Sequence, residues 1–336
     1  MPARKRWRKA ARMRPSFVTL TLNPTVDVAC NAGRVQTVHK VRTFAETYDP
    51  GGGGVNVARV LQELGADVQA VACCGGVSGH LLEELLAQAH VPCRAVRIAD
   101  RTRICMTVQD IGAGQEYRFV PEGPLLSPPE WQAALAAAED CNPDWLIASG
   151  SLPRGVPEDF YARLARTATA RGQRVVLDTS GPALRAALGS GLALIKPSLG
   201  EFETLVGRAL REPAAQEDAA RELVRAGAAE RVAVTLGRDG ALLATGEGVW
   251  RRPALDVPVR GAVGAGDSFL AAMVLALARG EGPAEALTWG TAAGAAAVMN
   301  TGTAHPARGQ IEALFRRMVA PSAANAAIPI SEPRGD

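Results

Sequence analysis

The chain has 336 residues, of which 47% are apolar and 21% are charged. That balance excludes a wholly disordered chain, and the lack of a Gly or Pro repeat excludes a collagen-like one. The first 14 residues carry seven basic side chains and no acid, so the formal charge of +3 leaves −4 (3 − 7) for the rest. This mildly acidic body disfavours nucleic-acid binding, and we expect residues 1–16 to form a disordered basic extension.

Short apolar segments rich in β-branched residues alternate with longer Ala- and Leu-rich segments from residue 17 onward. The predicted strands are Phe17–Leu22, Val68–Ala72, Trp145–Ser149, Arg174–Asp178, Ala193–Lys196, Arg231–Thr235 and Ala241–Ala244. The predicted helices are Asn56–Leu64, Leu81–Ala89, Pro129–Ala138, Pro157–Arg171, Gln216–Ala226, Ser268–Arg279 and a buried helix near Ala292–Met299. This alternation predicts an α/β fold with a mostly parallel sheet covered by helices on both faces.

Two segments, Cys30–Tyr48 and Arg94–Val120, are β-like and lack the helical pattern. We expect them to leave the main sheet and to pair as a small β lid, formed from about residues 28–48 and 94–120 of a domain that spans 17–320. The small, polar and Pro-containing segment 321–336 is predicted to be a disordered tail.

The cysteines point to a reducing compartment. There are six of them, too few for a disulfide framework in a chain of this length, and none forms the C-x-x-C pair of a zinc or redox site. No apolar run approaches the roughly 20 residues that cross a bilayer. We therefore expect a cytoplasmic protein without a membrane partner.

Several predicted strands end in small polar or charged residues. These ends are Asn23–Asp27, Ser149–Ser151, Asp178–Ser180, Lys196 and Thr235. In a parallel sheet the carboxyl ends of the strands share one edge, which is where such folds bind their ligands. The sequence thus predicts one ligand site at that edge.

The segment Gly264–Ala265–Gly266–Asp267 opens the predicted helix that runs to Arg279. Without bulky side chains, its backbone N–H groups can approach an anion at the positive end of the helix dipole. Asp267 would lie beside that anion and could accept a proton from an attacking hydroxyl. So short a motif also fits an ordinary helix start.

A second glycine run, Gly51–Gly54, precedes Asn56. Such a run makes sense where the backbone presses against a ligand, and the alternative is a flexible loop. The Asn56 amide can both donate to and accept from sugar hydroxyls. Neither a P-loop nor a protein-kinase catalytic loop is present, so those two ATP-binding classes are excluded.

The two glycine-rich segments belong to a larger set of motifs. Through this set, the chain from about Phe17 to Leu314 resembles the ribokinase-like (PfkB) sugar kinases, and within them the minor-isozyme type of 6-phosphofructokinase. Nine motifs in family order carry the resemblance: Thr19–Asp27, Pro50–Arg59, Arg101–Arg103, Glu116–Val120, Ser149–Pro153, Lys196–Ser198, Thr235–Gly240, Val263–Asp267 and Asn300–Thr303. The resemblance implies a three-layer αβα sandwich with a β lid. It also implies ATP-dependent phosphorylation of fructose 6-phosphate to fructose 1,6-bisphosphate.

The resemblance also implies roles for individual residues. Asp267 would be the base, with Gly264, Ala265 and Gly266 as the anion hole. The sugar phosphate would contact Asp27, Gly52, Gly53, Asn56, Arg103, Ser151 and Lys40. ATP would contact Lys196, Ser198, Thr235, Gly237, Gly240 and Asn300, and Glu201 would act on Mg²⁺. Family members often bind K⁺ through backbone carbonyls, here near Gly261, Val263, Ala297, Asn300 and Gly302, and pair as homodimers through the lid.

Some alternatives stay open from the residues alone. Asp27 could close an Asx turn instead of gripping a sugar, and Arg103 could be a solvated charge. The substrate could be fructose 1-phosphate or tagatose 6-phosphate, or the chain could bind a sugar phosphate without catalysis. Ser198 stands where the family usually has Asn, which puts metal or phosphate positioning there in question.

Lysine is scarce, and its placement is informative. The chain has only four lysines, of which Lys5 and Lys9 lie in the basic extension. The other two, Lys40 and Lys196, fall in the predicted lid and at a predicted strand end. A compact ammonium suits a phosphate as a point charge, so both are expected to handle phosphate groups.

Overall fold

The structure is a computed structural model, and it describes residues 15–261, 263–300 and 305–320. The disorder predicted for residues 1–14 and 321–336 lies outside this part of the chain, as do Ala262 and Gly302. Ser16, which the sequence places in the basic extension, is instead the first residue of strand β1. It is held there because the Asp144 carboxylate accepts hydrogen bonds from its backbone N–H and its hydroxyl, both at 3.0 Å.

The main sheet contains nine strands in the described residues, in the order β13-β12-β11-β10-β9-β8-β1-β4-β5. All neighbours are parallel except the pairs β11–β12 and β12–β13, which are antiparallel. The strands are β1 (Ser16–Thr21), β4 (Asp67–Cys74), β5 (Cys93–Arg97), β8 (Trp145–Ser149), β9 (Arg174–Asp178), β10 (Leu192–Ile195), β11 (Arg231–Thr235), β12 (Ala241–Thr245) and β13 (Gly248–Arg252). The predicted mostly parallel sheet is confirmed.

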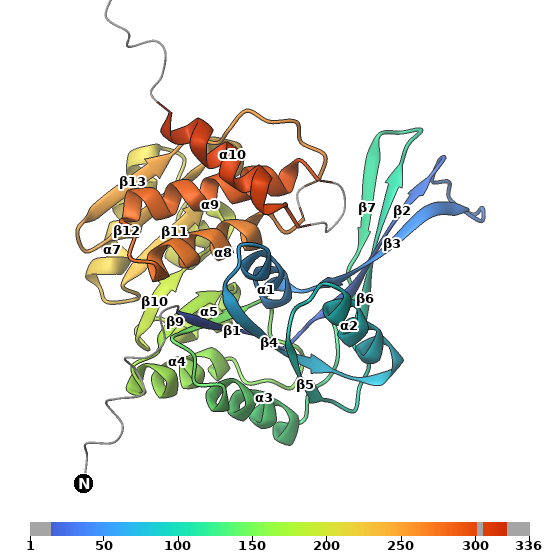
Figure 1. Ribbon diagram of the computed structural model, residues 1–336, viewed down its shortest axis with the longest axis horizontal. Coiled ribbons are helices and arrows are strands. Elements are labelled where there is room, and N and C mark those ends of the chain that lie inside the picture. The colour runs from blue at the N-terminus through green and yellow to red at the C-terminus, as the bar shows by residue number, and fades with distance from the viewer. Residues whose placement is uncertain (1–14, 262, 301–304, 321–336) are drawn as a thin grey trace, which may run out of the picture.

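Helices cover both faces of this sheet, so the molecule has three layers (Figure 1). One layer consists of α1 (Gly53–Glu63), α2 (Gly76–Gln88), α8 (Ala265–Ala278), α9 (Pro283–Val298) and α10 (Arg308–Val319). The other consists of α3 (Pro128–Asp140), α4 (Phe160–Ala170), α5 (Gly181–Ala187), α6 (Leu199–Val206) and α7 (Pro213–Arg225). Within the described residues, no helix is long and apolar enough to cross a membrane.

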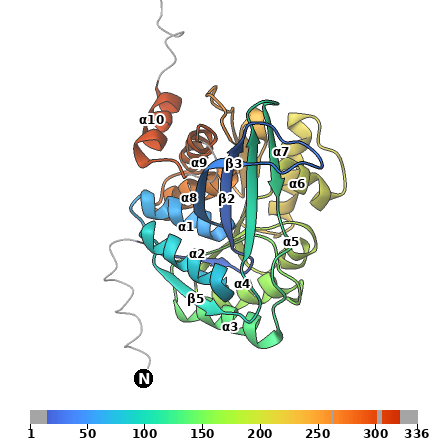
Figure 2. The same cartoon turned by 90° about the vertical axis from the view of Figure 1, so that its right-hand side faces the viewer.

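A second, four-stranded sheet projects from this body as a lid (Figures 1 and 2). Its strands, in spatial order, are β3 (Thr43–Gly51), β2 (Thr25–Ala32), β6 (Arg103–Asp110) and β7 (Gln115–Phe119). The prediction that the second lid segment begins at residue 94 is wrong. Residues 93–97 pair in parallel with β4 at the edge of the main sheet, because the chain returns to that sheet after α2 and enters the lid only at Arg103.

Candidate active site

The polar strand ends meet at one edge of the main sheet, as predicted. Ser149 and Asp178 are the last residues of two neighbouring strands and are directly paired in register. Lys196 follows the end of β10, and Ser198 forms an isolated bridge with Thr235 at the end of β11. The site is therefore assembled from the carboxyl ends of strands that are far apart in the sequence.

Asp267 lies in the first turn of α8, which begins after Gly264 in the left-handed region with φ of 73°. The Asn56 side-chain amide, from α1, donates a hydrogen bond to Asp267 Oδ2 at 2.9 Å. Burial and the neighbouring Asp178 raise the pKa of Asp267 to about 6, against the opposing effects of Asn56 and Lys196. Two residues predicted separately, from the two glycine-rich segments, thus form one hydrogen-bonded pair.

Lys196 is buried and forms an ion pair with Asp178, with 3.1 Å between Nζ and Oδ1. A Cβ atom at Gly266 would lie 3.4 Å from this ammonium, so Lys196 borders the turn that opens α8. Burial lowers the Lys196 pKa, but Asp178 and Asp267 outweigh that effect and the pKa is raised. The lysine therefore stays charged beside the turn.

Asp178 holds this lysine in place. The sequence placed it only among the polar strand ends and gave it no role of its own. Burial raises its pKa, while Lys196 and a hydrogen bond from the Ser149 hydroxyl act in the opposite direction. A charged residue at the end of an apolar strand, with a lysine at the end of the next strand, is the signal that could have identified this pair.

Asp27 lies within lid strand β2, opposite Asp49 of β3 and beside Cys105 of β6. Because the residue is in regular strand pairing, the Asx-turn alternative does not apply. Burial raises the Asp27 pKa to about 6, even though a hydrogen bond from Thr25 and the charge of Arg103 lower it. The sequence therefore located this carboxylate correctly near the strand ends, but not its place in the lid.

The glycine run is ordered, and its glycines meet the chain's own groups. A Cβ at Gly51 would lie 2.2 Å from Asp27 Oδ2, and one at Gly53 would lie 2.2 Å from the Ser149 hydroxyl. Gly52, the residue before α1, has φ of 105°, which side-chain-bearing residues rarely adopt. The flexible-loop alternative is wrong: these glycines let the lid strand and α1 approach β1 and β8 closely.

Arg103 is fixed by backbone carbonyls rather than solvated. It donates hydrogen bonds to the Pro121 and Asn23 carbonyl oxygens, both at 3.0 Å. The Asn23 side chain in turn donates to the Ser151 hydroxyl at 3.2 Å and to the Glu122 carbonyl at 2.9 Å. Asn23, which the sequence placed only at a strand end, therefore joins two predicted substrate residues into one network.

Ser198 and Glu201 form a capping box at the start of α6. Glu201 Oε2 accepts hydrogen bonds from both the backbone N–H and the hydroxyl of Ser198, each at 2.8 Å. Serine in place of the family's asparagine therefore binds the carboxylate directly. The Glu201 charge also raises the pKa of Lys196, so Glu201 lies close to the same site.

The segment after β11 is a tight turn with glycines at both ends. Gly237 and Gly240 have φ of 61° and 94°, and a Cβ at Gly240 would lie 2.0 Å from the Arg252 carbonyl oxygen. Thr235 reaches the Lys-Pro segment, since its N–H donates to the Pro197 carbonyl at 3.2 Å. The predicted nucleotide segments are thus brought side by side.

Gly261, in the loop before α8, lies against the end of α9, close to the predicted K⁺ residues Ala297 and Asn300. The N–H of Gly261 donates to the Val298 carbonyl at 3.3 Å, and the Asn300 side chain donates to the Ala296 carbonyl at 3.3 Å. Lys40 is not brought to the site. It is exposed in the loop between β2 and β3, and within the described part of the chain no hydrogen bond or ion pair joins it to the other predicted residues.

No group of three or more His, Cys, Asp or Glu in the described ranges is arranged to hold a metal ion by itself. The carboxylates of Asp178 and Glu201 nevertheless both act on Lys196 beside the α8 turn. Mg²⁺ is usually held by one or two carboxylates together with substrate phosphates, so this arrangement fits an ion that arrives with a nucleotide.

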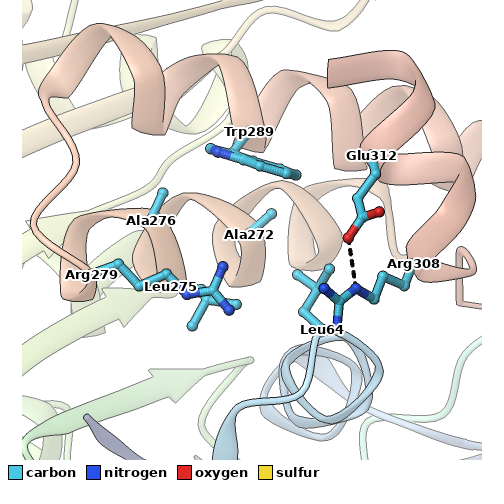
Figure 3. A pocket seen from close by; sticks show the side chains of 8 residues that line it. All are labelled: Leu64, Ala272, Leu275, Ala276, Arg279, Trp289, Arg308 and Glu312. Atoms are coloured by element: carbon cyan, nitrogen blue, oxygen red, sulfur yellow. Dashed lines mark hydrogen bonds and ion pairs between the residues drawn. The ribbon is translucent and has the colours of Figure 1, made fainter. Parts of the chain in front are cut away.

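A separate hollow lies between the C-terminal half of α8 and the start of α10 (Figure 3). Its volume is about 20 Å³, which is enough for a water molecule and too small for a metabolite. Trp289 and the ion pair between Arg308 and Glu312 line it. None of the candidate active-site residues lines this hollow. The hollow is therefore not part of the candidate active site.

Comparison with known proteins identifies the family of the chain. A family model described as pfkB family carbohydrate kinase matches residues 21–308. The chain is 39% identical over 314 residues to the ATP-dependent 6-phosphofructokinase isozyme 2 of Mycobacterium tuberculosis, covering 92% of this chain and 91% of that protein. Crystal structures of Escherichia coli phosphofructokinase-2 with potassium and with fructose-6-phosphate superpose with TM-scores of 0.87 and 0.86, at 36% and 35% identity, each covering 90% of this chain and 99% of theirs. The chain therefore belongs to the PfkB family of carbohydrate kinases.

Proposed function

We propose that this protein transfers the γ-phosphoryl group of ATP to the primary hydroxyl of fructose 6-phosphate. The observation that carries the proposal is the Asp267 carboxylate at the opening of α8, hydrogen-bonded by Asn56 and within electrostatic reach of Asp27. A non-catalytic sugar-phosphate binder would have no use for a carboxylate with a raised pKa behind an anion-binding turn. The name of the curated relative supports the same substrate pair.

Asp267 is assigned as the general base. With a pKa of about 6 it is ionised at neutral pH, yet basic enough to accept a proton from a hydroxyl as that hydroxyl attacks. The Asn56 amide holds one carboxylate oxygen, which leaves the other free to face the sugar. The proton moves from the sugar hydroxyl to this carboxylate while the new O–P bond forms.

The turn Gly264–Gly266 and Lys196 are assigned to the transferring phosphoryl group. Backbone N–H groups at the start of α8 and a buried ammonium beside Gly266 both stabilise negative charge there. Asp178 keeps that ammonium in place. The ATP itself would contact Ser198, Thr235, Gly237, Gly240 and Asn300.

Asp178 and Glu201 would hold Mg²⁺ together with the phosphates of ATP. When bound, the ion neutralises charge on the phosphoryl oxygens. Glu201 is presented by the capping box with Ser198, so its position is tied to the start of α6. A K⁺ ion would bind to backbone carbonyls of the loop before α8 and the end of α9, and a related crystal structure is described as a potassium complex.

The sugar phosphate would lie between β2 and the glycine run. Asp27, Asn56 and Ser151 offer a carboxylate, an amide and a hydroxyl for the sugar, next to the backbone of Gly52 and Gly53. Arg103 lies within electrostatic reach of Asp27 and supplies a cation for the phosphate that the substrate already carries. Kinases for neutral sugars have no need of that cation.

We further propose that two copies pair through their lids, which would bring Lys40 to the partner's site. Three exposed apolar side chains of the lid, Tyr48, Met106 and Phe119, lie on one face in register around the buried Val28: Met106 pairs with both Phe119 and Val28, and Val28 pairs with Tyr48. Of these, Tyr48 and Phe119 are 53% and 57% exposed. Exposed aromatic residues grouped on one face of a sheet favour contact with another protein surface.

A coupled assay for ADP release tests the activity. Turnover that depends on added fructose 6-phosphate supports the proposal, whereas a preference for fructose 1-phosphate or tagatose 6-phosphate would move the assignment within the family. If none of the three sugar phosphates is phosphorylated, the remaining alternative is a protein that binds a sugar phosphate without catalysis. Asp267→Ala is expected to lower kcat by about 10²–10⁴-fold, and near-full activity in that variant would refute its role as base.

A further inference from the structure

A buried arginine outside the predicted site connects α1 to the base of the lid. Arg59 is 5% exposed, and its Nη2 lies 2.9 Å from Asp49 Oδ1. Its Nη1 donates to the Pro50 carbonyl oxygen at 3.1 Å. Burying a guanidinium costs several kcal/mol in lost hydration, so an apolar side chain would serve packing alone at least as well. We therefore expect the charge of Arg59 to have a role beyond packing.

Asp49, the partner of this arginine, is the direct neighbour of Asp27. The two residues are opposite one another in the antiparallel pair β2–β3, so their side chains point to the same face. Like charges placed directly opposite are unfavourable, and both carboxylates are partly buried here. Gly51, the last residue of β3, leaves the space that the Asp27 carboxylate occupies. A cation behind Asp49 therefore acts on Asp27 as well.

We propose that Arg59 is a positioning residue: by pairing with Asp49 it offsets the like charge that faces Asp27, and so keeps the Asp27 carboxylate charged and in place to bind the sugar phosphate. The inference rests on the proposed function, since it takes the sugar hydroxyls as the ligand of Asp27. Neither residue touches the reacting atoms. Their effect is confined to the binding of one substrate.

The charges around Asp27 support this reading. Burial raises its pKa and so does Asp49, while the Thr25 hydroxyl, Arg103 and Arg59 lower it. From α8, Asp267 also interacts with Asp27. Removing the Arg59 charge would leave Asp49 uncompensated beside Asp27 and raise the Asp27 pKa further. Removing the Asp49 charge would lower it.

Two further groups belong to the surroundings of the pair. His305 lies near Arg59, which together with burial lowers the pKa of the imidazole, and His305 Nε2 is 3.6 Å from the Glu63 carboxylate. When Arg59 is removed, burial alone still favours the neutral imidazole, while Glu63 and Asp49 favour its protonated form.

The test measures fructose 6-phosphate binding by titration calorimetry between pH 5 and 8.5, in wild type, Arg59→Met, Asp49→Asn and the double variant. In Arg59→Met, the pH at which affinity falls is expected to rise by about one unit, which from a midpoint of about 6 corresponds to about a threefold loss of affinity at pH 6.5. Asp49→Asn is expected to move it in the opposite direction, and the double variant to return it toward wild type. Ionisation of the sugar phosphate is common to all four proteins and cancels from the comparison.

Controls separate positioning from folding. Arg163→Met removes an exposed arginine that pairs with Asp159 on α4 and is expected to leave the profile unchanged. Arg59→Lys keeps the charge and is expected to keep the wild-type midpoint. The KM for ATP is expected to change less than twofold in all variants. A general structural defect would instead raise the KM for both substrates.

Two outcomes would overturn the inference. The first is a folded Arg59→Met protein with the wild-type pH midpoint. The second is an Asp49→Asn protein whose pH midpoint is not lowered. The second outcome refutes the inference even if Arg59→Met does not fold. Failure of the proposed function is recognised separately, because wild type itself would then neither bind nor phosphorylate fructose 6-phosphate.

Discussion

Asp267→Asn is expected to make the protein more stable while it removes the activity. The Asp267 pKa is raised from 3.8 to about 6, which means that the folded protein holds an ionised carboxylate against its environment. At about 1.36 kcal/mol per pKa unit, the penalty above pH 7 is at most about 3 kcal/mol. The amide in Asp267→Asn has the same shape and can still accept the hydrogen bond from Asn56.

The sign of this effect sets its pH dependence. The unfolded chain loses its proton near pH 3.8 and the folded protein near pH 6, so the stability of wild type falls as the pH rises between those values. The advantage of Asp267→Asn should therefore grow from about 1.6 kcal/mol at pH 5 to about 3 kcal/mol at pH 8.

Urea unfolding followed by circular dichroism at pH 5, 6, 7 and 8, at one protein concentration and without ligands, measures this difference. Asp67→Asn is the control, because it removes an exposed carboxylate at the start of β4. An Asp267→Asn protein with no gain at pH 8, or with the same gain at pH 5 and 8, would refute the reasoning.

Three further changes probe the site. Gly53→Ala places a methyl group 2.2 Å from the Ser149 hydroxyl, so we expect a loss of about 1–3 kcal/mol in urea unfolding and a raised KM for the sugar phosphate. Lys196→Met leaves the buried Asp178 carboxylate unpaired and is expected to cost about 3–5 kcal/mol. Most of that stability should return with a second change, Asp178→Asn, while kcat stays low; a double variant as unstable as the single one would contradict the ion-pair account. Ser198→Asn tests the departure from the family pattern: we expect the Mg²⁺ concentration needed for half-maximal rate to change, and an unchanged value would place residue 198 outside the metal site.

The elements that the sequence predicted best are those whose local signal is strong. The strands Trp145–Ser149, Arg174–Asp178 and Arg231–Thr235 have the predicted ends, because each is a short apolar run that stops at a polar residue. β13 was missed because its five residues are all partly exposed and include two arginines. Likewise α5 and α6 are too short, at seven and eight residues, to show a helical period.

The residues of the candidate site also differ in how strong their local sequence signal is. Asp267 and Asn56 were predicted because glycine-rich segments mark them, although 211 residues separate them in the chain. Asp178 and Asn23 act by contacting residues on other strands, at distances along the chain that no local pattern encodes. Arg59 was visible only as part of a motif, since burial beneath the lid depends on the tertiary fold.

The hydrogen bond between Asn56 and Asp267 also bears on how the protein assembles. Its two helices, α1 and α8, are joined by a hydrogen bond that spans 211 residues of sequence, so they can meet only when the intervening chain has folded back. Contacts between such distant segments are formed late because closing the long loop between them costs entropy. Return of enzymatic turnover should therefore lag behind return of helical signal during refolding, so that catalysis itself reports completion of the native topology.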